Sequence, residues 1–121
     1  MSAKPLCLII EDDEDLSIIF EGALQEAGYE TEAITDGQIA LDRLAVITPA
    51  MVILDLHLPN ISGAEILEHI RSDKRLSGIR VMLTTADAQM AANIANLADV
   101  VLLKPVSFDQ LSLLATRLRK T

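Results

Sequence analysis

The sequence predicts an α/β fold in which five strands form a doubly wound parallel sheet, with five helices covering both faces. Short, continuously apolar runs such as Leu6–Ile10 and Ala50–Leu54 are typical of strands that are buried on both faces. Segments with apolar residues at helical spacing alternate with these runs, and this alternation favours a parallel sheet. A length of 121 residues suits one domain, expected to span residues 1–121.

Composition narrows the class of protein. Half of the residues are hydrophobic but only 2% are aromatic, so the core must be aliphatic. The single cysteine, Cys7, excludes an internal disulfide and lies in an apolar run, where a buried thiol in a reducing compartment is expected. A net charge of −8 argues against direct contact with nucleic acid. No apolar stretch approaches the ~18 residues of a membrane span and no signal peptide is recognisable, so we expect a cytoplasmic protein.

The first strand, Leu6–Ile10, ends in a run of acids from Glu11 to Asp15. A helix follows, with Gly28 at its C-terminal cap. The apolar positions of this helix are Leu16, Ile19, Phe20, Ala23, Leu24 and Ala27. The helix dipole favours acids at the N-terminus, which accounts for residues 13–15. It accounts less well for Glu11 and Asp12, which stand where the strand ends.

The next segments continue the alternation. Residues 29–34 predict a short edge strand, and a helix runs from Asp36-Gly37 to about Val46. The central strand then delivers Asp55 directly after its apolar run, and Pro59 stops it. Ser62 opens a helix with Glu65 in the spacing of a capping box.

The C-terminal part predicts two more strands and two more helices. Residues 81–83 form a strand that ends in Thr84-Thr85, and residues 86–98 form an alanine-rich helix. A strand over residues 100–103 ends in Lys104-Pro105. Ser107 caps the last helix, with Gln110 completing the box.

The four most apolar strands all end in polar residues. In parallel sheets ligands bind beyond the carboxyl ends of the strands, and those ends share one edge. This edge receives Glu11, Asp12, Asp55, the Thr84-Thr85 pair and Lys104. Three acids, a hydroxyl and a lysine at one edge predict a functional site.

The residue types indicate the chemistry of this site. Crowded carboxylates repel, so either one takes up a proton or a cation joins them. No histidine or cysteine is well placed to contribute a soft ligand, His57 being the only candidate nearby, and an all-oxygen site suits Mg²⁺ or Mn²⁺. Aspartate is a nucleophile in phosphoryl transfer, and a metal, a lysine and a hydroxyl would neutralise a phosphoryl group on Asp55.

Over essentially its whole length the chain resembles the receiver domain of two-component response regulators, related to the chemotaxis regulator of the flagellar motor. The motifs are the strand ending in Glu11-Asp12, then residues 54–59 with Ser62-Gly63, then Thr85-Ala86, then Lys104-Pro105. The resemblance implies a flavodoxin-like sheet with strand order 2-1-3-4-5. It also implies a cis bond between Lys104 and Pro105.

The resemblance also assigns roles. It implies that Asp55 accepts a phosphoryl group from a phosphohistidine. Asp12, Asp55 and the backbone carbonyl of His57 would bind Mg²⁺ directly, and Glu11 would act through a water. The hydroxyl of Thr85 and the ammonium of Lys104 would hold the phosphoryl oxygens. Thr85 is preferred to Thr84 because a small residue follows the hydroxyl residue in the family.

Other positions concern regulation. His57 and Asp87 are two residues beyond Asp55 and Thr85, where the family tunes phosphoryl lifetime; the alternative is two exposed polar residues on loops. Val101 stands where the family usually has an aromatic switch residue, and valine is stiff at χ1. The segment from Thr85 to Lys104 is also shorter than usual. We therefore expect an intact phosphorylation site and an output that uses another face or a static partner.

The resemblance implies a signalling protein and not an enzyme, apart from its own phosphorylation and dephosphorylation. Its partners would be a histidine kinase or phosphotransfer protein and a downstream protein or output domain, with a homodimer suggested by analogy alone. The chain ends directly after the last helix, so we expect a stand-alone receiver or the receiver portion of a longer regulator. Two alternatives stay open: a pseudo-receiver that binds without phosphorylation, and a haloacid-dehalogenase-type phosphatase. The phosphatase family places an aspartate where this chain has His57.

Overall fold

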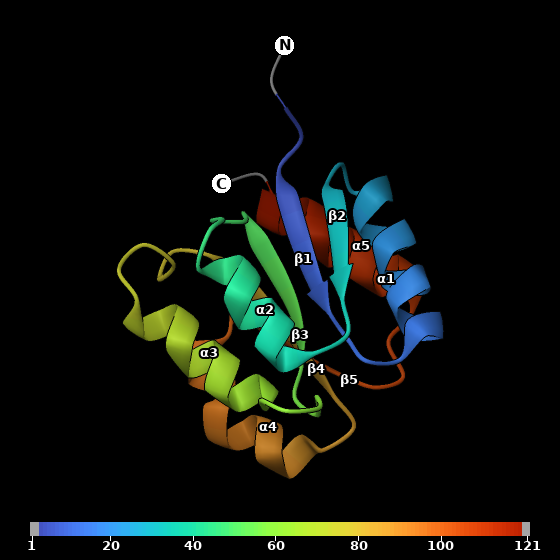
Figure 1. The fold of residues 1–121 in the computed structure, drawn as a ribbon. Coiled ribbons are helices and arrows are strands. Elements are labelled where there is room, and N and C mark those ends of the chain that lie inside the picture. The colour runs from blue at the N-terminus through green and yellow to red at the C-terminus, as the bar shows by residue number, and fades with distance from the viewer. Residues whose placement is uncertain (1–2, 120–121) are drawn as a thin grey trace.

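The computed structural model describes residues 3–119 and contains one five-stranded sheet (Figure 1). The strands are β1 (Leu6–Ile10), β2 (Glu30–Ile34), β3 (Met51–Asp55), β4 (Arg80–Thr85) and β5 (Val100–Leu103). Their order is β2-β1-β3-β4-β5, and every neighbouring pair is parallel. The predicted fold class and strand order are therefore confirmed.

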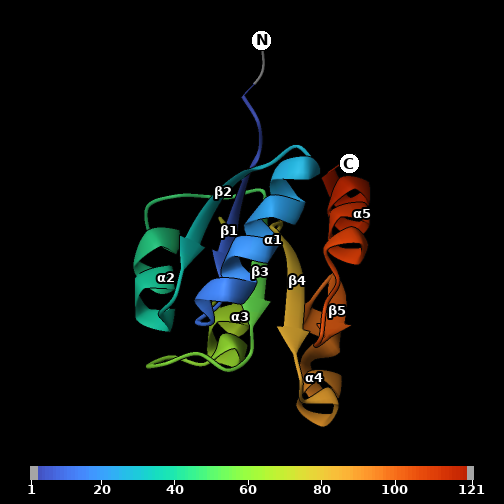
Figure 2. The ribbon, with the colours of Figure 1, turned by 90° about the vertical axis from the view of Figure 1, so that its right-hand side faces the viewer.

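Helices cover both faces of the sheet. They are α1 (Glu14–Glu26), α2 (Gly37–Leu44), α3 (Gly63–Ser72), α4 (Ala88–Ile94) and α5 (Phe108–Arg119), with a short 3₁₀ helix η1 (Ala95–Leu97) after α4. Figures 1 and 2 show α1 and α5 on one face and α2, α3 and α4 on the other. None of the helices between residues 3 and 119 has the length and apolarity that crossing a membrane would need.

Side-chain alternation along the strands builds two aliphatic cores. The core beneath α1 and α5 takes its strand residues from Cys7, Ile9, Met51, Ile53, Met82 and Leu102. The core beneath α2, α3 and α4 takes Leu8, Ile10, Val52, Leu54, Val81 and Leu83. Cys7 is fully buried, as predicted, and burial raises the pKa of its thiol. The same alternation decides on which face each strand-end residue lies.

Short polar side chains begin the helices as predicted. The carboxylate of Asp13 accepts from the backbone N–H groups of Asp15 and Leu16 at 3.0 and 3.1 Å. Ser62 accepts from Glu65 N at 3.2 Å, and Ser107 accepts from Gln110 N at 3.0 Å. These contacts satisfy N–H groups that have no partner within the helix.

Three predictions at the level of elements were wrong in detail. The helix predicted over residues 86–98 is α4 followed by η1, because Asp87 caps α4 and the chain tightens after Ile94. Helix α2 ends at Leu44, two residues before the predicted end at about Val46. Ile19 is 43% exposed instead of facing the core, because the sheet-facing side of α1 is formed by Phe20 and its helical neighbours.

Candidate functional site

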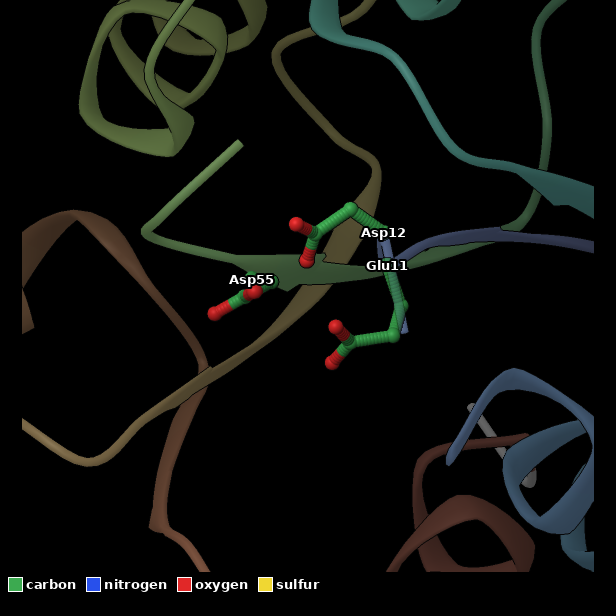
Figure 3. A group of neighbouring side chains, drawn as sticks. All are labelled: Glu11, Asp12 and Asp55. Atoms are coloured by element: carbon green, nitrogen blue, oxygen red, sulfur yellow. The ribbon is translucent and has the colours of Figure 1, made fainter. Parts of the chain in front are cut away.

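Three acids converge at the carboxyl edge of the sheet (Figure 3). Glu11 and Asp12 follow β1 and Asp55 ends β3, and these two strands are neighbours. One carboxylate oxygen from each acid lies within 4.8 Å of the others. Glu11 and Asp55 are buried and Asp12 is exposed, so the cluster is open to solvent on one side.

Lys104 completes the cluster from the far side of β4. Its Nζ donates to Glu11 Oε1 at 2.9 Å and lies 3.4 Å from Asp55 Oδ2. The Lys104–Pro105 peptide bond is cis, as the resemblance implied. An ammonium group therefore sits among the acids and offsets their repulsion.

The charges in the cluster perturb one another. Burial raises the pKa of Glu11 to about 7; the negative charge of Asp55 adds to the rise, and the hydrogen bond from Lys104 opposes it. Burial acts to lower the pKa of Lys104, but its hydrogen bond to Glu11 and the charges of Asp55 and Glu11 outweigh this and raise it. Burial is therefore the main reason that the pKa of Glu11 is raised, and the charge of Asp55 is a smaller one.

The backbone of the loop between β3 and α3 packs closely against Asp55. His57 N lies 3.4 Å from Asp55 Oδ1 at the start of the β3–α3 loop. A Cβ on Gly63 would lie 2.1 Å from the backbone oxygen of Asp55, so only glycine allows the loop to return this close. The sequence motif Ser62-Gly63 is thereby explained by the shape of the loop.

Thr85 ends β4 beside this loop and is fully buried. Its Oγ1 accepts from Asp87 N at 3.0 Å, and its carbonyl accepts from Lys104 N at 2.8 Å. The side chains of His57 and Asp87 are exposed. Val101 is half-buried against the core beneath α2, α3 and α4.

The acids fit a divalent cation that prefers oxygen ligands. Glu11, Asp12 and Asp55 offer carboxylates alone, and one of them is exposed to solvent. This donor set suits Mg²⁺, which keeps several waters and takes few protein ligands.

The structure brings together four of the predicted site residues: Glu11, Asp12, Asp55 and Lys104. The hydroxyl of Thr85 is engaged with the backbone of Asp87. Thr84, to which Thr85 was preferred, has its side chain on the same sheet face as Asp55. The sequence could have predicted this face, because Met82 and Thr84 are two residues apart on one strand and such side chains project from the same face.

Comparison with known proteins agrees with this geometry. The model of the response regulator receiver domain matches residues 7–116. The chain is 34% identical over 111 residues to the DNA-binding dual master transcriptional regulator RpaA of Synechocystis, covering 88% of this chain and 46% of that protein. It is 30% identical over 110 residues to the phosphate regulon transcriptional regulatory protein PhoB of Rhizobium meliloti, covering 88% and 48%.

Solved structures give the same fold. The chemotaxis response regulator CheY4 of Vibrio cholerae superposes with a TM-score of 0.86 at 22% identity, covering 96% of this chain and 99% of that one. The chain spans about half the length of the two curated relatives. Together, the match over residues 7–116 and the acidic site at the sheet edge show that the chain belongs to the response regulator receiver domain family of two-component signalling.

Proposed function

We propose that this receiver domain takes a phosphoryl group onto Asp55 and thereby changes its contacts with a partner. The contact set around Asp55 carries the proposal: two further acids lie within 4.8 Å, and Lys104 Nζ lies 3.4 Å from Asp55 Oδ2. A carboxylate that is buried at a strand end beside an ammonium group is positioned to hold added negative charge.

In the proposed step, an oxygen of Asp55 attacks the phosphorus of a phosphohistidine. The phosphorus–nitrogen bond breaks, the imidazole keeps the electron pair, and Asp55 becomes an acyl phosphate. Attack of water on the phosphorus later releases phosphate and restores the carboxylate. Lys104 and the hydroxyl of Thr85 stabilise the phosphoryl oxygens, and His57 and Asp87 modulate the lifetime.

The residues of the site would also hold Mg²⁺. Asp12, Asp55 and the backbone carbonyl of His57 would hold the ion directly, and Glu11 would act through a water. The bound ion supplies positive charge against the phosphoryl oxygens. Burial raises the pKa of Glu11 and the negative charge of Asp55 adds to the rise, so a cation near these two carboxylates would be favourable.

The partners follow from this reaction. A histidine kinase or phosphotransfer protein supplies the phosphoryl group, and an output segment or a separate protein reads the result in the cytoplasm. RpaA is named as a DNA-binding regulator. For the present chain, with its net charge of −8, we propose that the receiver portion itself contacts protein and not nucleic acid, alone or as a homodimer.

Intact-mass spectrometry after incubation with acetyl phosphate and Mg²⁺ tests the proposal. We expect one phosphoryl adduct on the wild type, and none with Asp55→Ala or without metal. Correctly folded protein that never forms the adduct, with acetyl phosphate or with a phosphorylated phosphotransfer protein, would contradict the proposal and favour a pseudo-receiver. Sustained turnover of small phosphate esters would favour a phosphatase.

A further inference from the structure

Thr84 carries a buried hydroxyl that the proposed reaction does not yet use. The residue is fully buried, and its Oγ1 has no hydrogen-bond partner among residues 3–119. Ser17 Oγ is the other such side-chain atom in this part of the chain. Burial of a hydroxyl without a partner is unfavourable, so its presence beside a reactive site calls for a functional explanation.

The sheet register places Thr84 within the site. Asp55 on β3 pairs with Thr84 on β4, and Thr84 pairs with Leu102 on β5. Paired residues of parallel strands project from the same face of the sheet. That face is the one beneath α1 and α5, because Met82 and Leu102 belong to its core.

The side chain of Lys104 has to pass over the end of β4 to reach its two acidic partners. Lys104 directly follows β5. Its Nζ nevertheless lies 3.4 Å from Oδ2 of Asp55, at the end of β3, and 2.9 Å from Oε1 of Glu11, which directly follows β1. Strand β4 stands between β5 and β3, so the lysine side chain passes over the end of β4. Thr84 lies on this route, between Leu102 and Asp55.

We propose that Thr84 is a positioning residue for Lys104, its hydroxyl accepting an N–H of the ammonium group when a phosphoryl group is present on Asp55. This inference rests on the proposed function. In the structure the ammonium faces Glu11 and Asp55. An ammonium has three donors, and turning one toward Thr84 leaves the others for the carboxylate and the phosphoryl oxygens. The contact also satisfies the buried hydroxyl.

The test measures the rate of phosphorylation by acetyl phosphate, by intact mass, with melting temperature as a second readout. Thr84→Val keeps the shape and removes the hydroxyl, and we expect phosphorylation to slow by about tenfold, the order expected for one hydrogen bond to a charged group. The melting temperature of the unphosphorylated variant should rise, because an unpartnered buried hydroxyl is gone. Thr84→Ser should restore the rate to within about twofold of wild type, since it keeps the hydroxyl.

Two controls separate this role from a structural one. Ser17→Ala removes the matched buried hydroxyl on α1 and should leave the phosphorylation rate unchanged. In a Lys104→Ala background, Thr84→Val should have no further effect, because the two residues act together.

Thr84→Val that is phosphorylated at the wild-type rate would overturn the inference while leaving Asp55 as the acceptor. Thr84→Ser that is as slow as Thr84→Val would also overturn it, since the methyl group would then be what matters. If Thr84→Val slowed phosphorylation just as much in the Lys104→Ala background, its effect could not act through Lys104, and the inference would be wrong. A wild-type protein that is never phosphorylated would instead count against the proposed function.

Discussion

At the scale of single residues, the site depends on a glycine that carries no chemistry. Gly63 begins α3, and a Cβ there would lie 2.1 Å from the backbone oxygen of Asp55 and 2.7 Å from Leu56 Cα. Both obstacles are backbone atoms, which cannot move away as a flexible side chain could. The loop that follows Asp55 therefore requires glycine at this position.

Gly63→Ala should lower the free energy of unfolding by about 3 kcal/mol, because the loop must shift to accept the methyl group. Urea denaturation followed by circular dichroism measures the loss. Gly78→Ala is the matched control, since a Cβ there meets nothing within 4 Å, and its effect should stay within about 1 kcal/mol. Equal effects of the two substitutions would show that the close approach at Asp55 has no energetic consequence.

Tyr29 gives a second test at this scale, in alkaline solution. Its hydroxyl donates to Ala115 O at 3.3 Å, and burial raises the pKa of Tyr29 to about 12. The folded state holds the phenolic proton more tightly than the unfolded state, whose tyrosine ionises near pH 10. The stability from this group is therefore complete below pH 10 and is lost as the pH rises toward 12.

Because Tyr29 is the only tyrosine and the chain has no tryptophan, ultraviolet absorbance reports its ionisation without interference. We expect the titration midpoint of the folded protein to lie well above that of the urea-unfolded protein. Tyr29→Phe should flatten the fall in stability between pH 10 and 12. Coincident midpoints in the folded and unfolded protein would contradict the predicted shift.

At the scale of elements, a single arginine ties η1 to the end of α3. Arg71, in the last turn of α3, donates to Leu97 O at 2.6 Å, Ile79 O at 2.6 Å and Ser77 O at 3.0 Å. It also pairs with Asp99 Oδ2 at 3.0 Å, and the same carboxylate oxygen accepts from Val81 N at 2.7 Å. These contacts join the end of α3 to η1 and to the loops before β4 and β5.

Arg71→Lys should lower the free energy of unfolding by about 2 kcal/mol, because an ammonium cannot span the carbonyl groups that the planar guanidinium reaches. Arg43→Lys is the comparison: among residues 3–119 the guanidinium of Arg43 pairs with one partly exposed carboxylate, that of Glu32, through two hydrogen bonds and reaches no backbone carbonyl group, so the loss there should stay within about 1 kcal/mol. Thermal unfolding of both variants measures the difference. A loss for Arg71→Lys no greater than that for Arg43→Lys would show that the carbonyl contacts add nothing.

The sequence predicted the elements well where patterns are local and less well where partners are distant. Apolar runs predicted the strands, and Asp36, Ser62 and Ser107 predicted helix starts, because each signal lies within a few residues. The position of η1 depends in part on the hydrogen bond from Arg71 to Leu97 O, 26 residues along the chain, and no local pattern reveals such a contact. The position of Lys104 over β4 likewise needs the strand order.

At the scale of the whole molecule, the fold gathers its reactive groups at one edge of the sheet. Three separate segments supply these groups: the end of β1 supplies Glu11 and Asp12, the end of β3 supplies Asp55, and the end of β5 supplies Lys104; the parallel topology brings them together. The two aliphatic cores hold the strands that carry these residues. Any signal has to leave this edge through changed contacts of the surrounding loops and helices.

Val101 limits the ways in which a change at Asp55 can reach an output surface. It packs against the core beneath α2, α3 and α4, and its branched side chain cannot rotate as an aromatic ring does. We therefore propose that output uses another face or a static partner. A structure with beryllofluoride on Asp55, a mimic of the phosphoryl group, should show Val101 and α4 in their present positions. Concerted movement of both would contradict the proposal.

The central claim is that Asp55 is the phosphoryl acceptor, and locating the acyl phosphate tests it most directly. After incubation with acetyl phosphate and Mg²⁺, borohydride reduction converts an aspartyl phosphate to homoserine, and peptide mass spectrometry finds its position. We predict homoserine at residue 55 alone, dependent on the metal. Homoserine at Asp12 or another carboxylate, or a stable phosphoryl group that resists borohydride, would contradict the account.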